Sequence, residues 1–280
     1  MTELGMPTRD IFIKRGRPDP TFLILLPIHR PPDLLNFAIR SIFCQTEQDF
    51  EVHIICDGAP EETVNEATAL AQAHKQIASH VFSKGERNGE IYRDPIIRST
   101  QAKYICQISD DDIWFPNHLA EIGRLLQTCD FGHTIQVDAL PNFKLYPHFG
   151  DISDPATASK MIHERFNIFG PTASGYHQQA YLKLEEGWNA APPDIWTDLH
   201  MWRKFLRNDK ITCGSRFSFT NLHIAATSHN HMSLQERKTI NEKWWNCVSN
   251  PGKLDRLIQG LKKHSIHADG KFPWQMGFWT

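Results

Sequence analysis

Apolar runs alternate with helix-periodic segments through the first part of the chain. Residues 22–28 form an unbroken apolar run, which is typical of a strand buried on both faces. Apolar residues then recur at helical spacing between 34 and 43, and 50–56 is a second strand-like run. An Ala-rich helix over 61–75 and a third strand at 77–82 follow. Strands that alternate with helices predict parallel βαβ units.

A fourth predicted strand leads directly into three carboxylates. Residues 104–108 are apolar or β-compatible and contain no Gly or Pro, and Asp110, Asp111 and Asp112 come after them. Adjacent carboxylates repel one another at the mouth of a buried strand, unless a cation or a set of donors offsets the charge. A divalent metal is the simplest such cation. A solvated acidic turn that caps a helix starting near Pro116 is an equal alternative on these residues alone.

Polar residues follow three of these strands where each one ends. His29 and Arg30 come after the first strand, Asp57 after the second, and the acidic triplet after the fourth. In open α/β sheets, ligands bind at the carboxyl ends of the strands. The order of elements therefore predicts that these side chains converge on one site.

The pattern weakens in the second half of the chain. A helix over 116–127 and a strand over 131–137 are clear, but short apolar pieces and prolines between 138 and 167 predict an irregular excursion from the sheet. The Pro-rich segment 188–196, with two exposed-looking tryptophans, is expected to be a loop that leads into a helix over 198–207.

The last part of the chain is more polar. An apolar strand-like run over 211–227 is interrupted by His223, and a charged helix is expected from Ser233 to about Lys263. With 280 residues and 40% hydrophobic content, one large domain with an elaborated C-terminal part is the better interpretation.

Composition narrows the possible partners and the compartment. A net charge of −2, with 15 His and a pI near 6.7, gives no electrostatic case for binding nucleic acid or an anionic membrane. The 6 cysteines are widely spaced without a C-x-x-C pair, which favours free thiols in a reducing compartment. No apolar run approaches the ~20 residues of a membrane span, and no signal-like core follows Met1. We therefore expect a cytoplasmic protein without a transmembrane segment.

Several segments of the first half resemble the inverting family 2 glycosyltransferases, which have the GT-A fold. Ile24–Pro31 resembles the opening strand and P-T-Y-N-R segment of that family. Ser41–Thr46 with Asp49–Val52 resembles its S-[VI]-L-x-Q-T…[DF]-E-[IV] run, and Ile55–Gly58 resembles V-D-D-G-S. The similarity spans roughly residues 22–128, and its specificity lies in the shared order and spacing of the segments. It implies a GT-A-like, Rossmann-related α/β fold, with a mostly parallel central sheet flanked by helices and a C-terminal helical extension.

Two departures from the family pattern bear on the site. The family often reads D-A-D-D, and Ser109 stands where the first Asp would be. By this match Asp110 would face the ribose of a donor and Asp111 would face the metal. Asp57 falls on the second Asp of V-D-D, which implies contact with the base, and Cys56 replaces the first Asp.

The resemblance implies further contacts on the donor side. Arg93 falls on the arginine of the family's A-R-N segment, and several members place a late histidine, here His229, on the metal or the donor phosphates. Arg93 could be a surface arginine, while the family match favours contact with the diphosphate or the base, and a surface histidine is an equal alternative for His229. Nucleotide-sugar contacts are thus expected at Pro27, Ile28, His29, Arg30, Asp57, Arg93 and Asp110, and metal contacts to Mn²⁺ or Mg²⁺ at Asp111 and His229.

Beyond residue 128 the resemblance is thinner. Residues 197–203 resemble the helix start E-D-x-x-L-W-x-R, which implies that Asp198 is the general base, although Arg203 sits one residue early. A helix N-terminus favours the ionised carboxylate, but an ordinary N-cap is the alternative. Trp188 and Trp196 would stack on an acceptor sugar or simply pack inside the protein.

The expected function is therefore metal-dependent transfer of a sugar from a nucleotide sugar, with a UDP-sugar as the expected donor, to a hydroxyl of a glycan or similar acceptor, with inversion. A nucleotidyltransferase shares the topology, but it would need a Gly-rich phosphate loop after the first strand, and residues 29–32 do not form one. A degenerate nucleotide-sugar-binding protein is a third possibility. Ser109 favours it, whereas Asp111 and Asp198 argue against it.

The expected organisation follows from this function, while the oligomeric state stays open. It comprises an N-terminal arm (1–20), a nucleotide-sugar-binding half (21–137) and an acceptor-binding half (138–232) of one GT-A domain, and a C-terminal helical extension (233–280).

Overall fold

The computed structural model describes residues 19–224, 229–267 and 274–275, so the arm expected at 1–20 lies almost entirely outside the described residues. The sheet begins with four strands that run in parallel: β1 (Phe22–Ile28), β2 (Phe50–Asp57), β3 (Ile77–Phe82) and β4 (Tyr104–Gln107). It continues through β6 (Phe131–Ala139), β7 (Lys144–His148), β8 (Ser174–His177), β9 (Cys213–Phe219) and β11 (Trp274–Gln275). A separate ribbon pairs β5 (Ile113–Trp114) with β10 (Asn221–Leu222).

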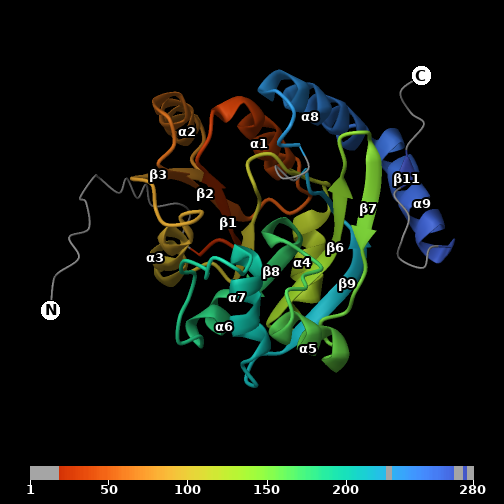
Figure 1. Ribbon diagram of the computed structural model, residues 1–280. Helices are drawn as coiled ribbons and strands as arrows, with labels where there is room; N and C mark the ends of the chain where they lie inside the picture. Colours follow the sequence, from red (N-terminus) through yellow and green to blue (C-terminus); the bar gives the residue numbers. More distant parts are fainter. Residues whose placement is uncertain (1–18, 225–228, 268–273, 276–280) are drawn as a thin grey trace, which may run out of the picture.

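The helices that cover the sheet come mostly from the connections between strands. Those of the first half are η1 (Pro32–Leu34), α1 (Leu35–Phe43), α2 (Glu61–Ala73), η2 (Glu90–Tyr92), α3 (Arg93–Ser99) and α4 (His118–Leu125). Those of the second half are α5 (Pro155–His163), η3 (Pro171–Ala173), α6 (Gln178–Leu182), α7 (Thr197–Leu206), α8 (Leu234–Val248) and α9 (Pro251–His267). Figure 1 shows how they surround the sheet.

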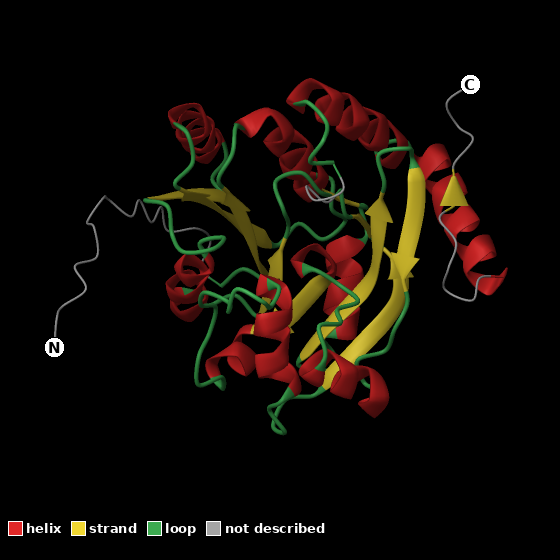
Figure 2. Cartoon of the chain, in the orientation of Figure 1, coloured by secondary structure: helices red, strands yellow, loops and turns green. Residues whose placement is uncertain are grey.

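Strand β1 lies at the centre of the parallel part, between β2 and β4. Ile24 and Leu26 pack in the core under α1, α2 and α4, whereas Leu23 and Leu25 pack in the core under α3, α6 and α7. Because successive side chains of a strand point to opposite faces, a strand covered on both faces needs apolar residues at every position. Burial on both faces explains the unbroken apolar run, and Figure 2 shows helices on both sides of the sheet.

The other part of the sheet is mixed. Its order is β11-β7-β6-β8-β4-β1-β2-β3, and β9 pairs with β6. Strand β8 is antiparallel to both β4 and β6, while β9 is parallel to β6. Strand β8 thus joins the parallel part to the mixed part, and the far end of the long strand β6 pairs with β7. The predicted α/β sheet with flanking helices is confirmed.

The expected irregular excursion over 138–167 is wrong. Strands β6 and β7 form an antiparallel hairpin there, and α5 follows with the side chain of Asp154 accepting from the N–H of Thr157 at 2.9 Å. Pro155 occupies the first turn of α5, where a missing N–H costs nothing. Pro147 pairs with Val137 on one side and lies beyond the residues that pair with β11 on the other. Both prolines therefore fit regular structure at positions that tolerate them.

The prediction of a single charged helix from Ser233 to about Lys263 is also wrong, because two helices form there. Ser233 caps α8 in a reciprocal capping box with Glu236, as its position at the predicted helix start suggested. Helix α8 ends at Val248 and α9 begins at Pro251. Proline lacks the N–H that a continuing helix needs, and it disfavours helical backbone at the preceding residue, Asn250. Within the described ranges, no helix has the length and apolar character needed to cross a membrane.

Candidate functional site

The acidic turn after β4 is buried, and the arginine after β1 holds its first carboxylate. Asp110, Asp111 and Asp112 are only 3%, 2% and 0% exposed. Arg30 donates from Nε and Nη2 to the two oxygens of Asp110, at 2.7 Å each. This two-point geometry is the strongest form of a guanidinium–carboxylate contact. The ends of β1 and β4 therefore meet, as the order of elements predicted.

Asp111 is bound from two elements. Its Oδ2 lies 3.1 Å from Nη2 of Arg30 and accepts from Nη2 of Arg237 at 2.7 Å. The main-chain oxygen of Asp111 accepts from Nδ2 of Asn241 at 2.8 Å. Arg237 and Asn241 both stand on α8, so the C-terminal helix takes part in the site. Sequence reasoning missed both residues, because a charged helix carries no motif that singles them out.

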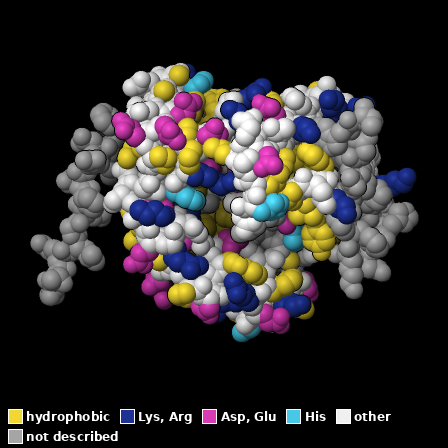
Figure 3. Space-filling model, turned by 45° about the horizontal axis from the view of Figure 1, so that its top comes forward, with side chains coloured by type: hydrophobic (Ala, Val, Ile, Leu, Met, Phe, Trp, Pro, Cys, Tyr) yellow, Lys and Arg dark blue, Asp and Glu magenta, His cyan; other side chains and the backbone are white. Residues whose placement is uncertain are grey.

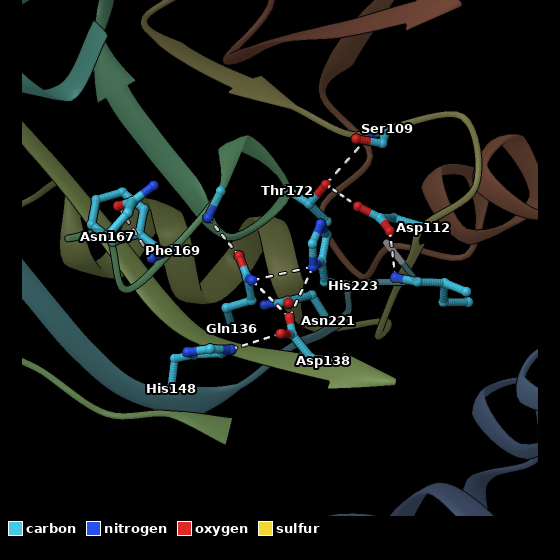
Figure 4. Close-up of polar contacts among 12 residues, drawn as sticks. Ser109, Asp112, Gln136, Asp138, His148, Asn167, Phe169, Thr172, Asn221 and His223 are labelled. Carbon is cyan, nitrogen blue, oxygen red and sulfur yellow. Dashed lines mark hydrogen bonds and ion pairs between the residues drawn. The ribbon is translucent and has the colours of Figure 1, made fainter. Parts of the chain in front are cut away.

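Asp112 has a different environment from its neighbours. It accepts from the hydroxyl of Thr172 in η3 and from the N–H of Ile224 at 2.7 Å (Figure 4). These contacts tie the acidic turn to the second half of the chain, and the completely buried side chain serves the fold. Burial raises the pKa of all three carboxyl groups, and Arg30 opposes that shift at Asp110 and Asp111.

The carboxylate oxygens of the acidic turn are suitable ligands for a hard divalent cation, but they make up only part of a coordination shell. Carboxylate oxygens are the ligands that Mg²⁺ and Mn²⁺ prefer, and Oδ1 of Asp111 accepts no hydrogen bond from the described residues. Across the described ranges, however, no group of three or more His, Cys, Asp or Glu side chains is arranged to hold a metal. The residues thus fit an ion that is shared with a phosphate ligand, and they do not form a complete protein cage.

His229 is fully buried at the start of the segment that leads into α8. Its main-chain oxygen accepts from the N–H of Met232 at 3.0 Å. Residues 225–228, immediately before it, lie outside the described residues. It is therefore not the surface histidine of the alternative interpretation, and its role as a metal ligand stays a prediction.

Asp57 closes the end of β2 and is 2% exposed. Its Oδ1 accepts from the N–H of Gly85 at 2.6 Å, and Lys84 forms an ion pair with Oδ2. Gly89 has a φ of +62°, and a Cβ there would lie 2.4 Å from Cγ of Asp57. Only glycine allows this left-handed backbone to approach the carboxylate so closely. A carboxylate has about four lone-pair sites, so Asp57 can accept another hydrogen bond from a ligand.

Arg93 is not a surface arginine, because only 4% of it is exposed. Its guanidinium lies over the ring of Trp188, with 4.6 Å from Cζ to the ring centroid. Nη2 donates to the main-chain oxygen of Asn88 at 3.4 Å, whereas Nε is buried with no partner among the described residues. Burial lowers the pKa of this guanidinium, and nearby Glu90 opposes the shift. A buried cation with an unused donor is suited to an anionic or oxygen-rich ligand.

The two tryptophans differ in exposure. Trp188 is 2% exposed, donates from its indole N–H to the hydroxyl of Tyr176 at 3.0 Å, and packs edge-on against Trp202. Our expectation that it is exposed is wrong: the ring packs in the core and is not presented to an acceptor. Trp196 is 44% exposed and carries the guanidinium of Arg165 over its ring at 4.8 Å. Of the two, Trp196 is the one that an acceptor can reach.

The other expected donor contacts surround the end of β1. Ile28 is fully buried and Pro27 half-buried, so these two residues shape the strand end through their backbone. His29 is exposed beside Arg30. Partial burial and the neighbouring charge of Arg30 lower the pKa of His29. The imidazole is thus the accessible side chain of this strand end.

Asp198 lies in the first turn of α7 and is half-buried. It is not an ordinary N-cap, because Trp196 holds that position. Oδ2 accepts from Nδ2 of Asn167 and Oδ1 accepts from the N–H of Leu199, both at 2.8 Å. Burial raises the pKa of this carboxyl group, and the Leu199 N–H and the charge of His223 oppose the shift.

A cluster of polar side chains that the sequence did not predict stands at the end of β6 (Figure 4). Asp138 accepts from His148 at 2.7 Å, from His223 at 2.8 Å and from Gln136 at 2.8 Å. Burial lowers the pKa of His223, but Asp112 and Asp138 outweigh it and raise the pKa to about 9. His223 is therefore an imidazolium at neutral pH.

This cluster reaches from the acidic turn to Asp198. Oε1 of Gln136 accepts from the N–H of Gly170, and a Cβ at Gly170 would lie 3.6 Å from Oδ2 of Asp198. The charge of His223 acts on both Asp111 and Asp198. On the face turned forward in Figure 3 the surface is hollowed near its centre, and basic, acidic and histidine side chains surround the hollow. In the sequence His223 appeared only as a break in an apolar run.

Comparison with known families and proteins agrees with this architecture. The family model described as "Glycosyl transferase family 2" matches residues 23–148. The chain is 25% identical over 150 residues to the succinoglycan biosynthesis protein ExoW of Rhizobium meliloti (strain 1021), which covers 49% of this chain and 44% of that protein. It is 26% identical over 96 residues to the uncharacterized glycosyltransferase alr2836 of Nostoc sp. (strain PCC 7120), which covers 34% of this chain and 30% of that protein. The chain thus spans less than half the length of these relatives.

Solved structures share the fold at low sequence identity. A mannosyltransferase, PcManGT from Pyrobaculum calidifontis, in complex with GDP-Man and Mn²⁺, has a TM-score of 0.53 at 14% identity, over 91% of this chain and 79% of that chain. Residues 1–349 of S. aureus TarS give a TM-score of 0.51 at 10% identity, over 74% of this chain and 61% of that chain. These likenesses confirm the GT-A-like fold, and the match of the family model to residues 23–148 confirms the predicted resemblance to family 2 glycosyltransferases.

Proposed function

We propose, from this resemblance to family 2 glycosyltransferases, that the protein transfers a sugar from a nucleotide-sugar donor to a hydroxyl acceptor with inversion at the transferred sugar. The observation that carries the proposal is the pair of buried carboxylates, Asp110 and Asp111, that two arginines hold at the carboxyl end of β4. A site that already balances buried negative and positive groups can exchange some of these contacts for a ribose and a diphosphate.

The donor side of the site comprises Arg30, Asp110, Asp111 and Arg237, together with Asp57 as the contact for the base. A UDP-sugar fits Asp57, because its carboxylate can accept from the imino N–H of uracil. A GDP-sugar remains the alternative that the experiment must separate, since guanine also presents N–H donors. Solved structures with this fold carry UDP in one case and GDP-Man in another. Arg93, whose Nε has no partner among the described residues, lies close enough to Asp57 for the two charges to interact, and we assign it to donor contact.

Mn²⁺ or Mg²⁺ is the proposed cofactor, held by Asp111 together with the diphosphate, with His229 as a further candidate ligand. When bound, such an ion supplies positive charge that stabilises the diphosphate as it departs. The chain itself contributes Arg30 and Arg237, whose guanidinium groups lie at Oδ2 of Asp111. These groups can donate to the same phosphate oxygens and so share the leaving-group charge.

Asp198 is the proposed general base. It would take the proton of the acceptor hydroxyl as that oxygen attacks the sugar, a contribution of roughly 10²- to 10⁴-fold in rate. Burial raises the pKa of Asp198, which makes the carboxylate a stronger base near neutral pH. The imidazolium of His223 favours the ionised form that the reaction needs.

The proposed acceptor is a glycan, or a similar molecule rich in hydroxyls. Trp196 offers a partly exposed aromatic ring two residues from Asp198, and aromatic faces pack well against sugar rings. The name of the relative ExoW places that protein in succinoglycan biosynthesis, which supports a polysaccharide pathway for this chain as well.

A ligand panel tests this function directly. Thermal unfolding of the protein with UDP-, GDP-, dTDP- and CMP-sugars, each with and without Mn²⁺, should show a rise in melting temperature for one nucleotide class, because ligands that bind only the folded state stabilise it. The responding donor is then incubated with oligosaccharide acceptors, and the anomeric configuration of the product is read by NMR. No stabilisation by any nucleotide sugar would contradict the proposal.

A further inference from the structure

The side chain of Arg237 joins helix α8 to the acidic turn. Arg237 lies well beyond residues 23–148, the part of the chain that the family model matches. Its Nη2 donates to Oδ2 of Asp111 at 2.7 Å. Asn241 stands four residues later, on the same face of α8, and donates to the main-chain oxygen of Asp111 at 2.8 Å. Helix α8 is therefore fixed to the backbone of the turn independently of the Arg237 side chain.

The guanidinium of Arg237 has a donor to spare. The side chain is 12% exposed, and its Nε is buried without a hydrogen-bond acceptor among the described residues. Buried N–H groups are almost always paired, so an unpaired one beside a charged site is explained if a ligand completes it. Arg30 uses Nε and Nη2 on the carboxylates, and its Nη1 donates to none of the described residues. Both arginines thus hold unused donors beside Asp111.

A divalent ion on Asp111 would meet these two cations. Oδ2 of Asp111 already contacts Arg30 and Arg237, whereas Oδ1 accepts no hydrogen bond from the described part of the chain. Like charges a few ångströms apart repel strongly when water is excluded, so an ion on this carboxylate weakens the hold of a guanidinium there. A diphosphate has the opposite effect, because its oxygens attract the planar donor fork of arginine.

We propose that Arg237 changes partner during donor binding: it holds Asp111 in the ligand-free protein and donates to the diphosphate of the nucleotide sugar when a divalent ion occupies Asp111. This inference rests on the proposed function. Asn241 keeps α8 in register with the turn while the Arg237 side chain moves between its two partners. Arg237 thereby weakens the binding of the ion alone but strengthens the binding of the nucleotide once the ion is present. The affinities for the ion and for the nucleotide therefore depend on each other.

Two titrations of the full chain test the exchange. The first measures Mn²⁺ alone, by electron paramagnetic resonance of the free ion, and the second measures UDP and GDP at saturating Mn²⁺ by calorimetry. Arg237→Gln removes the competitor, so Mn²⁺ alone should bind about tenfold more tightly, whereas the preferred nucleotide should bind about tenfold more weakly. Opposite changes in the two affinities distinguish this role from a structural one, since a damaged fold weakens both.

Two further variants serve as controls. Arg237→Lys keeps the charge but loses the donor fork, so Mn²⁺-alone affinity should stay near wild type and nucleotide affinity should fall between wild type and Arg237→Gln. Lys238→Gln makes the same change of charge one position along α8. Lys238 lines a separate cleft of about 580 Å³ with Asp33 and Glu62, so this variant should leave both affinities unchanged.

The outcomes separate the two proposals. Unchanged or weaker binding of Mn²⁺ alone by Arg237→Gln would overturn the hold on Asp111, and an unchanged nucleotide affinity would overturn the exchange. The Mn²⁺-alone titration needs no nucleotide. Suppose that Arg237→Gln tightens the binding of Mn²⁺ alone while the wild-type protein binds neither UDP nor GDP. In that case the contact of Arg237 with Asp111 is supported, and the proposed donor and the change of partner are both contradicted.

Discussion

The carboxylates on the two sides of the proposed site have different positively charged partners. On the donor side, Arg30 and Arg237 hold Asp110 and Asp111. On the proposed acceptor side, which we define by Asp138, His148, His223 and Asp198, two histidines contact the half-buried Asp138. Arginine stays protonated at every pH at which a protein folds, whereas histidine titrates in the physiological range. Above neutral pH, the acceptor side should therefore change its charge while the arginines of the donor side keep theirs.

Of the changes that test this comparison, removal of the Arg30 side chain should have the largest effect, and it should lower the free energy of unfolding. Arg30→Ala leaves Asp110 buried without its two-point partner, and the loss of one partner of a buried ion pair costs about 3–5 kcal/mol. Denaturant unfolding at pH 7 measures this free energy. Arg98→Ala is the matched control, because its partner Asp94 lies on the same helix surface and exposed pairs contribute only about 0–1 kcal/mol. Equal losses in the two variants would show that Arg30 is not needed to neutralise the turn.

Asp198→Asn should separate chemistry from binding. The amide keeps the shape and the contact from Asn167 but cannot accept the proton, so turnover should fall by about 10²-fold or more while nucleotide affinity stays unchanged. Steady-state rates and calorimetry on one preparation check both values. Asp194→Asn, in the exposed loop before α7, is the control and should leave turnover unchanged. If Asp194→Asn loses the activity instead, the general base has been assigned to the wrong carboxylate.

His223 should give the acceptor side its pH dependence. Asp112 and Asp138 raise the pKa of His223 from 6.5 to about 9, so the protonated form stabilises the fold. That contribution is fully present below about pH 6.5 and is lost as the pH rises through 9, and a shift of this size corresponds to on the order of 3 kcal/mol. Unfolding free energies of the wild type and of His223→Gln between pH 6 and 10 measure it, and the variant should lack the decline. His148→Gln, which removes the other histidine on Asp138, should keep the decline.

Trp196→Ala should have the smallest effect. A partly exposed ring that stacks on a sugar contributes about 0.5–1.5 kcal/mol, so the KM for the acceptor should rise several-fold while donor affinity and stability stay nearly unchanged. Initial rates at varied acceptor concentration check this. A change in donor affinity of the same size would place Trp196 outside the acceptor side.

The sequence predicted the donor side better than the acceptor side, and the reason is physical. Parallel strands buried on both faces leave continuous apolar runs, and the strand ends carry their polar residues at fixed places along the chain. The sequence therefore located Arg30 and Asp110 before the structure showed their contact. One sequence alone does not show which side chain of a charged helix reaches a distant turn. Arg237 and Asn241 were therefore not predicted.

The acceptor side depends on packing between distant segments. Asp138 and His223 are 85 positions apart and meet only because β6 lies beside the end of β10. Trp188 looked exposed within a Pro-rich loop, but Arg93 and Trp202 enclose it. The break between α8 and α9 was open to prediction from Pro251, because proline rarely continues a helix.

The most direct test of the central claim compares two neighbouring carboxylates of the acidic turn. Oδ1 of Asp111 accepts no hydrogen bond from the residues that the structure describes, whereas both oxygens of Asp112 accept hydrogen bonds, from Thr172 and from the N–H of Ile224. Calorimetry of the preferred nucleotide, with and without Mn²⁺, should show that Asp111→Asn loses the gain in affinity from the ion and that Asp112→Asn keeps it, although Asp112→Asn lowers the unfolding free energy. An Asp111→Asn variant in which Mn²⁺ still supports nucleotide binding as in the wild type would contradict the account.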